Sequence, residues 1–334
     1  MGKSMKYYNN ILDIIGKTPL VKIGNGLAEG GPLMLGKLEF ISPCGSVKDR
    51  MACHILKKAL QEGRIKPGDT IIDNSSGNAG AAEAMTAAVL GLKAIITVPD
   101  KTSKEKIDLI KSFGAEVIIC PADVPHDHPE GYYMKAHNLA REHGYFHVNQ
   151  YHSQANVEAH YRATGPEIWQ DTDGKITHFV VGIGTGGTAS GAGRYLKEKN
   201  SRIRVIAIDP VGSMFAPYLK ENKMVEASAY AMEGIGSDVM TEALHPDIID
   251  EVISVSDKDA FDTARLLARE EGIMAGGSAG AAVWAARGMA GQLNQNDIVV
   301  VVIPDSGSKY LSKCFNDDWM RCRGFLDKKQ EVAK

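Results

Sequence analysis

Three short segments of the sequence carry residue types that could do chemistry. The first is Ser42-Pro43-Cys44-Gly45-Ser46-Val47-Lys48-Asp49-Arg50, in which a lysine follows a turn of small residues. The second is the small, polar run Ser75-Ser76-Gly77-Asn78-Ala79-Gly80, and the third is the glycine-rich run Gly182-Ile183-Gly184-Thr185-Gly186-Gly187-Thr188. An amine, a polar turn of substrate size and a phosphate cradle could together hold an aldehyde cofactor that carries one phosphate. They predict pyridoxal phosphate, and therefore chemistry at the α and β carbons of an amino acid.

Lys48 is the candidate for cofactor attachment and catalysis. Most lysines are solvated surface charges, but Lys48 lies where a Pro/Gly/Ser turn meets a predicted amphipathic helix over residues 49–60. Burial at such a junction would lower the pKa of the amine, which favours imine formation. We interpret Asp49 as an acid in the first helical turn and Arg50 as part of a structural ion pair.

The run from Ser75 to Gly80 directly follows a short apolar strand predicted over residues 70–73. Its hydroxyls, and the free N–H groups at the start of the next helix, could hold a carboxylate. A simple N-cap is the alternative interpretation. Six small polar residues are more than a cap alone needs, so we favour a substrate turn.

The glycine-rich run supports two interpretations. It matches G-x-G-x-x-G from Gly182, it lies between a predicted strand and helix, and Asp209 ends the next strand. A dinucleotide fingerprint would look like this, which leaves open a non-catalytic nucleotide-binding or ligand-binding protein. That fingerprint normally lies in the first βαβ unit, however, whereas this one lies past the middle of the chain. Thr185 and Thr188 also add hydroxyls where a single phosphate would use them.

Two later turns have the same strand-to-helix setting. Ala275-Gly276-Gly277-Ser278-Ala279-Gly280 contains a serine that could cap a helix or face a ligand. Pro304-Asp305-Ser306-Gly307 follows an apolar strand over residues 298–303. Polar turns at the carboxyl ends of such strands are where α/β sheets bind ligands.

The elements that must position these turns alternate between strand and helix. Apolar strands and amphipathic or alanine-rich helices follow one another in β-α-β-α order, which predicts a largely parallel sheet with helices on both sides. The expected strands cover residues 70–73, 94–98, 116–119, 178–181, 204–208 and 298–303, and the expected helices cover 49–60, 78–90, 103–113 and 187–199. We expect a smaller N-terminal α/β domain over residues 45–150. The larger, cofactor-binding domain would comprise residues 1–44 and 151–334, with the cofactor in the cleft between the two.

Composition narrows the class of protein. The chain has 334 residues, 44% hydrophobic and 24% charged, and a formal net charge of −3. That charge and the absence of a basic stripe argue against nucleic-acid binding. No run of apolar residues is long enough to span a membrane, and the first residues do not have the apolar run expected of a secretory signal, so we expect neither. The five cysteines are widely spaced without C-x-x-C, so we expect no disulfide framework, no metal site and a cytoplasmic location.

These residues together resemble the β family of pyridoxal-phosphate enzymes, fold type II, and within it cystathionine β-synthase and cysteine synthase. The match covers roughly residues 10 to 325. It is carried by Ile15-Gly16-Lys17-Thr18-Pro19-Leu20-Val21, by Gly45 to Arg50, by Gln150-Tyr151, and by the segment from Pro304 to Met320.

The resemblance implies a role for each matching residue. Lys48 would bind the cofactor and act as the catalytic base. Asn78 would also bond the ring hydroxyl of the cofactor, and Ser278 would face its pyridine nitrogen. A hydroxyl there cannot keep that nitrogen protonated, which suits elimination rather than transamination. The phosphate would be held by Gly184, Thr185, Gly186, Gly187 and Thr188. The substrate would be held by Ser75, Ser76, Gly77, Asn78, Ala79, Gln150 and Gly234.

The resemblance also implies the reaction. We expect β-replacement on serine, O-acetylserine or cysteine by a thiol or sulfide, forming cysteine or cystathionine through an aminoacrylate. A cysteine-consuming reaction that releases hydrogen sulfide and forms lanthionine or serine is the alternative within the family. Departures from the family pattern include Ala79, which replaces a threonine, Asp73-Asn74, which replace Glu-Pro, and Ser237, which replaces a tyrosine that bears on homocysteine use. A homodimer acting on small molecules is the implied assembly.

Overall fold

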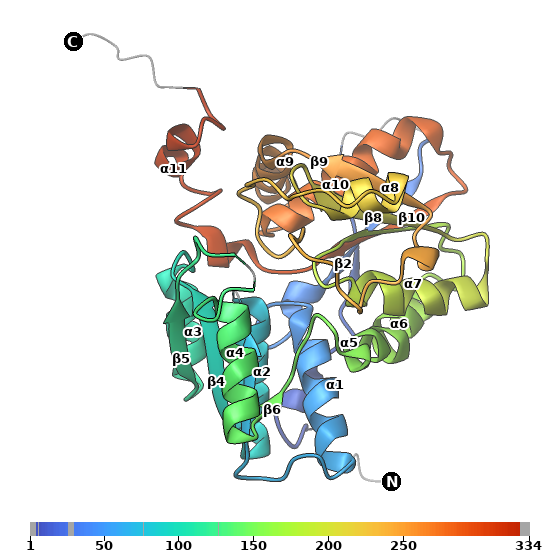
Figure 1. The fold of residues 1–334 in the computed structure, drawn as a ribbon. Coiled ribbons are helices and arrows are strands. Elements are labelled where there is room, and N and C mark those ends of the chain that lie inside the picture. Colours follow the sequence, from blue (N-terminus) through green and yellow to red (C-terminus); the bar gives the residue numbers. More distant parts are fainter. Residues whose placement is uncertain (1–4, 6, 26–29, 76, 126, 328–334) are drawn as a thin grey trace.

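The computed structural model describes residues 5, 7–25, 30–75, 77–125 and 127–327. These residues form two sheets flanked by helices (Figure 1). The smaller sheet has four strands in the order β5-β4-β3-β6, all paired in parallel. Its strands are β3 (Thr70–Asn74), β4 (Lys93–Pro99), β5 (Glu116–Cys120) and β6 (Phe146–His147).

The larger sheet has six strands in the order β1-β2-β10-β7-β8-β9. All of its pairs are parallel except that of β1 with β2, which is antiparallel. The first two strands come from the N-terminal part of the chain, and the others come from its second half. The strands are β1 (Leu20–Lys22), β2 (Leu33–Leu38), β7 (His178–Gly182), β8 (Arg204–Pro210), β9 (Glu251–Val255) and β10 (Ile298–Ile303).

Helices cover both faces of both sheets. The longer ones are α1 (Lys48–Gln61), α2 (Asn78–Leu90), α3 (Lys104–Ser112), α4 (Tyr132–His143), α7 (Gly187–Lys199), α9 (Asp257–Glu270) and α10 (Gly277–Met289). The shorter ones are α5 (Gln154–Ala159), a π-helical turn over His160–Thr164, α6 (Gly165–Asp171), α8 (Phe215–Glu221) and α11 (Asp317–Cys322). No helix among the described residues is both long and apolar enough to cross a membrane.

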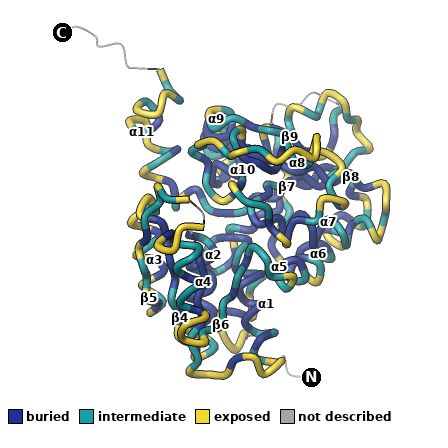
Figure 2. The backbone as a smooth tube through the Cα atoms, in the orientation of Figure 1, coloured by how far each residue is buried: buried dark blue, intermediate teal, exposed yellow. Residues whose placement is uncertain are grey.

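The apolar strands are buried on both faces because successive side chains belong to different cores. In β3, Ile71 packs with α1, α2 and α3, whereas Ile72 packs with α4. In β10, Val301 belongs to the core under α9 and α10, and Val300 to the core under α6 and α7. Figure 2 shows the resulting band of buried backbone through both sheets. The α/β fold expected from continuous apolar strands is therefore confirmed.

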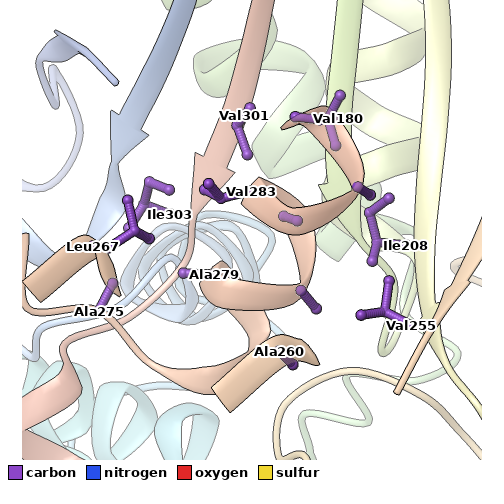
Figure 3. Close-up of a cluster of buried hydrophobic side chains, with 14 of the residues drawn as sticks. Val180, Ile208, Val255, Ala260, Leu267, Ala275, Ala279, Val283, Val301 and Ile303 are labelled. Atoms are coloured by element: carbon purple, nitrogen blue, oxygen red, sulfur yellow. The ribbon is translucent and has the colours of Figure 1, made fainter. Parts of the chain in front are cut away.

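Helix α10 packs closely against both β10 and α9. Figure 3 shows Ala279 and Val283 of α10 in one cluster with Val301 of β10 and Ala260 of α9. The close approach depends on Gly280, because a Cβ there would lie 2.0 Å from the carbonyl oxygen of Ala260. This packing fixes the first turn of α10 beside the end of β10, where Ser278 lies.

Candidate active site

One cavity of about 620 Å³ is lined by segments that follow strands of both sheets. It lies where strands β3, β7 and β10 end, so the turns after these strands meet around it. Most of the residues singled out from the sequence line it: Lys48, Ser75, Gly77, Asn78, Ala79, Gln150, Gly184, Thr185, Gly234 and Ser278. Ser76 lies outside the described residues.

Lys48 is the first residue of α1 and faces this cavity. Among the residues that the structure describes, its ammonium nitrogen has no hydrogen-bond partner. Burial lowers the pKa of Lys48, the carboxylate of Asp305 opposes that change, and the nearby ammonium of Lys309 lowers the pKa further. The result is an amine that loses its proton more easily than a surface lysine and that is free to react.

The turn before Lys48 is pinned against the segment that follows β10. Val47 N donates to Pro304 O at 2.8 Å, and Ser306 N donates to Gly45 O at 3.2 Å. Asp49 closes the turn from the other end, because its carboxylate accepts the N–H of Cys44 at 2.7 Å. The position of Lys48 is thus set by contacts between segments more than 250 residues apart.

Arg50 forms the structural ion pair expected from the sequence. Its guanidinium donates to Glu39 at 2.6 and 2.9 Å and to both carboxylate oxygens of Glu167 at 2.7 Å. Arg50 and Glu39 are almost fully buried, and these contacts tie α1 to α6 below the cavity. The structural ion pair expected for Arg50 is therefore present.

The turn after β3 is partly occupied by its own hydrogen bonds. The Ser75 hydroxyl accepts the N–H groups of Gly77 at 3.1 Å and Gly80 at 2.9 Å, which is the capping role considered as an alternative. The N–H groups of Asn78 and Ala79 open α2 and have no partner within the helix. These amides, rather than the Ser75 hydroxyl, are what the turn offers to an anion.

Gln150 closes the same region from the segment after β6. Its amide nitrogen donates to Asn74 O at 3.2 Å, and the side chain is buried. Its amide oxygen receives no hydrogen bond from the described residues. Gln150 therefore lies beside the turn, as expected, with half of its amide already in use.

Asn78 belongs to a network that the sequence did not reveal. Its amide nitrogen donates to Asp305 at 2.7 Å, and its amide oxygen accepts from Lys309 at 2.7 Å. The Tyr310 hydroxyl donates to the same Asp305 oxygen at 2.5 Å. The other carboxylate oxygen of Asp305 is buried and has no partner among the described residues. Asp305 lies in the polar turn after β10 that the sequence singled out, but its contact with Asn78 was not predicted.

The glycine loop between β7 and α7 approaches neighbouring backbone closely. A Cβ at Gly184 would lie 2.7 Å from Gly234 O, and one at Gly186, whose φ is +87°, would lie 2.5 Å from the backbone of Leu244. Gly184 and Thr185 line the cavity, whereas Gly186, Gly187 and Thr188 form the turn and the start of α7 behind it. The loop thus presents Gly184 and Thr185 to the cavity, and the N-terminus of α7 follows directly after them.

The two threonine hydroxyls of this loop are held by protein groups. Thr185 Oγ1 accepts from Asn156 Nδ2 at 3.0 Å, and Thr188 Oγ1 lies 3.2 Å from His160 Nε2. Burial holds the pKa of His160 well below its usual value, so its imidazole is neutral at pH 7. Neither Asn156 nor His160 belonged to a recognisable motif.

Ser278 is the second residue of α10 and lines the cavity with a hydroxyl. It is 4% exposed. The chain therefore presents a neutral group at this position, not a carboxylate. One carboxylate oxygen of Asp305 is engaged by Asn78 and Tyr310 instead.

Three charged side chains form linked ion pairs at the rim of the cavity. The carboxylate of Glu233 forms ion pairs with Lys106 of α3 and with Lys313. Burial raises the pKa of Glu233, but the two lysines outweigh burial and hold it below its usual value. Glu233 directly precedes Gly234, so its place beside a predicted substrate residue could have marked it.

These residues fit pyridoxal phosphate. A reactive amine, the glycine loop at Gly184 and Thr185, an amide at Asn78 and a hydroxyl at Ser278 all line one cavity. Among the described residues, no cluster of three or more His, Cys, Asp and Glu side chains could hold a metal ion. The fold and site are those of an α/β enzyme whose cavity could hold a phosphate-bearing cofactor beside Lys48.

Comparison with known proteins identifies the family. A family model described as pyridoxal-phosphate dependent enzyme matches residues 11–305. The chain belongs to this family, whose cofactor is pyridoxal phosphate. The resemblance noted from the sequence and the prediction of the cofactor are both confirmed.

Individual relatives fall into more than one activity class. Cystathionine beta-synthase of Apis mellifera is 40% identical over 328 residues, which are 97% of this chain and 65% of that protein. Cysteine synthase of Staphylococcus aureus (strain Mu50) is 41% identical over 310 residues, which are 92% of this chain and 97% of that protein. A crystal structure of O-ureido-L-serine synthase matches with a TM-score of 0.86 and 34% identity, covering 95% of this chain and 100% of that one.

The coverage limits what can be carried over from these relatives. This chain spans 65% of the length of the Apis mellifera enzyme and 61% of that of the Oryctolagus cuniculus cystathionine beta-synthase. The similarity to three differently named enzymes shows the family and the fold, and it leaves the substrate open.

Proposed function

We propose that the protein catalyses β-replacement on a serine-type amino acid, with serine, O-acetylserine or cysteine as donor and a thiol or sulfide as acceptor. The observation that carries this proposal is the amine of Lys48, which has a lowered pKa and no hydrogen-bond partner among the described residues. It faces a cavity that is also lined by the turn after β3 and by the glycine loop. The names of the relatives, which include cystathionine beta-synthase and cysteine synthase, support the same reaction class.

The residues would divide the work as follows. Bound pyridoxal phosphate supplies an electron sink that makes the α proton of the amino acid acidic and lets the β substituent leave. The Lys48 amine removes and returns the proton at the α carbon. The N–H groups of Asn78 and Ala79, with Gln150, bind the substrate carboxylate. The loop from Gly184 to Thr188 binds the phosphate at the start of α7.

Ser278 and the rim would control which reaction follows. A serine hydroxyl cannot keep the pyridine nitrogen protonated, so the ring withdraws electrons less strongly, which favours β-elimination and addition over transamination. The Lys106–Glu233–Lys313 group would close the cavity and exclude water from the reacting carbon.

The acceptor is the less constrained half of the proposal. Ser237 stands where a tyrosine is common in cystathionine enzymes, and its hydroxyl donates to Val239 O at 2.7 Å. It therefore offers little to an incoming amino-acid thiol. This favours sulfide or a small thiol as the acceptor. The second candidate function is the reaction that uses cysteine as the donor and releases sulfide.

The remaining expectations belong to the same proposal. We infer that residues 45–150 move as a smaller domain relative to residues 1–44 and 151–334, because the two sheets are built from these parts. A cytoplasmic homodimer stays a prediction. Light scattering of the purified protein tests the dimer.

The absorption spectrum of the purified protein tests the function. We expect a visible band from the lysine-linked cofactor, and a change in that band when the preferred donor is added from among L-serine, O-acetylserine and L-cysteine. Sulfide release from L-cysteine, compared with product formation from L-serine and sulfide, separates the two candidates. A protein that stays colourless after incubation with pyridoxal phosphate would refute the proposal and favour the nucleotide-binding interpretation of the glycine loop.

A further inference from the structure

We propose that Lys309 is a positioning residue of the active site, which fixes the side-chain amide of Asn78 so that it presents a hydrogen-bond donor to the cavity. The inference rests on the proposed function, because the group that Asn78 would meet there is the ring oxygen of the cofactor. Lys309 belonged to no motif and was not singled out from the sequence.

Lys309 joins three parts of the active site. It lies in the 3-10 turn Gly307–Tyr310, four residues after Asp305. Its ammonium nitrogen is 2.7 Å from Asn78 Oδ1 at the start of α2 and 2.8 Å from Cys44 O in the turn before Lys48. One side chain thus connects the cofactor lysine's turn, the substrate turn and the end of β10.

The two partners of Asn78 determine which way its amide points. A lysine ammonium can only donate and an ionised carboxylate can only accept. Lys309 must therefore face the amide oxygen of Asn78, and Asp305, at 2.7 Å, must face the amide nitrogen. One N–H of that nitrogen is used by Asp305. The second N–H remains for a group in the cavity that Asn78 lines.

A donor at this position selects the charge state of its partner. An N–H stabilises an ionised ring oxygen, whereas an amide oxygen turned toward the same place would repel it. Without Lys309, the amide oxygen of Asn78 loses its donor, and the amide is held by Asp305 alone. We therefore expect the un-ionised form of the ring oxygen to become more populated when Lys309 is replaced.

Other charged and titratable groups also face Lys309. They are Asp305 in the same segment, Asp49 on α1, Cys44 before α1, Lys106 on α3, and the cofactor lysine Lys48. Because Lys309 also lowers the pKa of Lys48 directly, its effect through Asn78 must be separated from its effect as a charge. A cycle with an Asn78 variant makes that separation.

The test compares absorption spectra of the cofactor-loaded protein from pH 6 to 9. Lys309→Met removes the donor, Lys309→Gln keeps one, and Lys258→Met changes an exposed lysine that pairs with Asp262 on α9. We expect Lys309→Met to raise the fraction of the shorter-wavelength, un-ionised form by about threefold or more. Lys309→Gln should restore most of the wild-type spectrum, and Lys258→Met should leave it unchanged.

The Asn78→Ala background decides how Lys309 acts. We expect Lys309→Met to have no further effect on the spectrum there. An unchanged spectrum in the Lys309→Met single variant would overturn the proposal, because Lys309 would then have no effect on the cofactor. An equal shift with and without Asn78 would also overturn it, because Lys309 would then act directly on Lys48.

A second measurement needs no cofactor. In protein labelled with [15N]asparagine, the side-chain resonance of Asn78 is assigned by its loss in Asn78→Ala. We expect the amide proton that donates to Asp305 to exchange with water at least about tenfold more slowly than those of exposed Asn9. Lys309→Met should reduce this protection, because the amide is then free to turn away from Asp305. Fast exchange in the wild type would refute the link even if Lys309→Met failed to fold. If wild-type protein binds no cofactor, the proposed function fails, and this measurement still decides the role of Lys309.

Discussion

The ammonium of Lys106 on α3 pairs with the carboxylate of Glu233, which lies in the segment between β8 and β9. The aliphatic part of Lys106 also covers Gly77, where a Cβ would lie 2.6 Å from Lys106 Cδ. One lysine therefore connects the smaller sheet's side of the cavity to the larger sheet's side. It does so while only 5% exposed.

We expect Lys106→Met to lower the free energy of unfolding by about 1–3 kcal/mol, because it leaves the partly buried Glu233 carboxylate with only Lys313. Urea denaturation measures the change. Lys104→Met is the matched control on the same helix, since its ion pair with Asp108 is exposed, and its midpoint should not move. Equal losses of unfolding free energy in the two variants would show that the Lys106–Glu233 ion pair stabilises the fold no more than an exposed ion pair does.

Lys48→Ala should abolish turnover. Loss of the catalytic base alone costs about 10²–10⁴ in rate, and loss of the cofactor linkage adds to that. Added methylamine should restore part of the rate in this variant, which would show that a missing amine, not a damaged fold, is the cause. Wild-type turnover by Lys48→Ala in a steady-state assay would assign the base elsewhere.

Asp49 should make the protein less stable as pH rises. Burial raises its pKa to about 7, whereas an aspartate in the unfolded chain loses its proton near 3.8. Between these values the folded state binds more protons than the unfolded state, so the free energy of unfolding falls with increasing pH, by up to about 1.4 kcal/mol per unit. Asp209, raised to about 6, contributes with the same sign.

We therefore expect Asp49→Asn to flatten, without removing, the decline in stability between about pH 4 and 7. Urea titrations at pH 5, 6 and 7 measure the slope for both proteins. An identical slope in the variant would mean that the Asp49 carboxyl is ionised throughout this range.

Gly184→Ala should weaken cofactor binding by about tenfold or more, because the new methyl group would meet the backbone oxygen of Gly234 rather than a flexible side chain. Titration of cofactor-free protein with pyridoxal phosphate measures the affinity. Gly288→Ala is the control: nothing lies within 4 Å of its Cβ, and alanine suits its position in α10. Unchanged affinity in Gly184→Ala would remove this loop from the phosphate site.

The regular part of the fold could be predicted because its signals are local. The helices over residues 78–90 and 187–199, and the strand over 298–303, are found with the expected bounds. Strand β6 has two residues and β1 has three. Strands this short show no recognisable periodicity of apolar residues. Helix α9, whose buried Phe261, Ala264 and Leu267 follow a helical period, carried a readable signal that the sequence analysis did not use.

The candidate site divides in the same way. Lys48, Ser278 and the glycine loop lie in strand-to-helix turns, so their residue types marked them. Lys309 reaches Asn78 across 231 positions, and Lys106 reaches Glu233 across 127. Such contacts between distant parts of the chain arise from packing, and no local sequence pattern predicts them. Ser75 differs from these residues. Its hydroxyl caps the start of α2, which is the simpler role that the local sequence also allowed.

The strand order β1-β2-β10-β7-β8-β9 places β10, one of the last elements of the chain, between β2 and β7. During synthesis on the ribosome, β2 emerges early, and the edge that pairs with β10 stays unpaired until residues 298–303 have been made. The smaller sheet, by contrast, is complete once residue 147 has emerged. Asp305 and Lys309 directly follow β10, so the nascent enzyme has no finished catalytic centre until its final strand is inserted. An incomplete chain of this protein would therefore be inactive, and it would expose the strand edges most prone to aggregation.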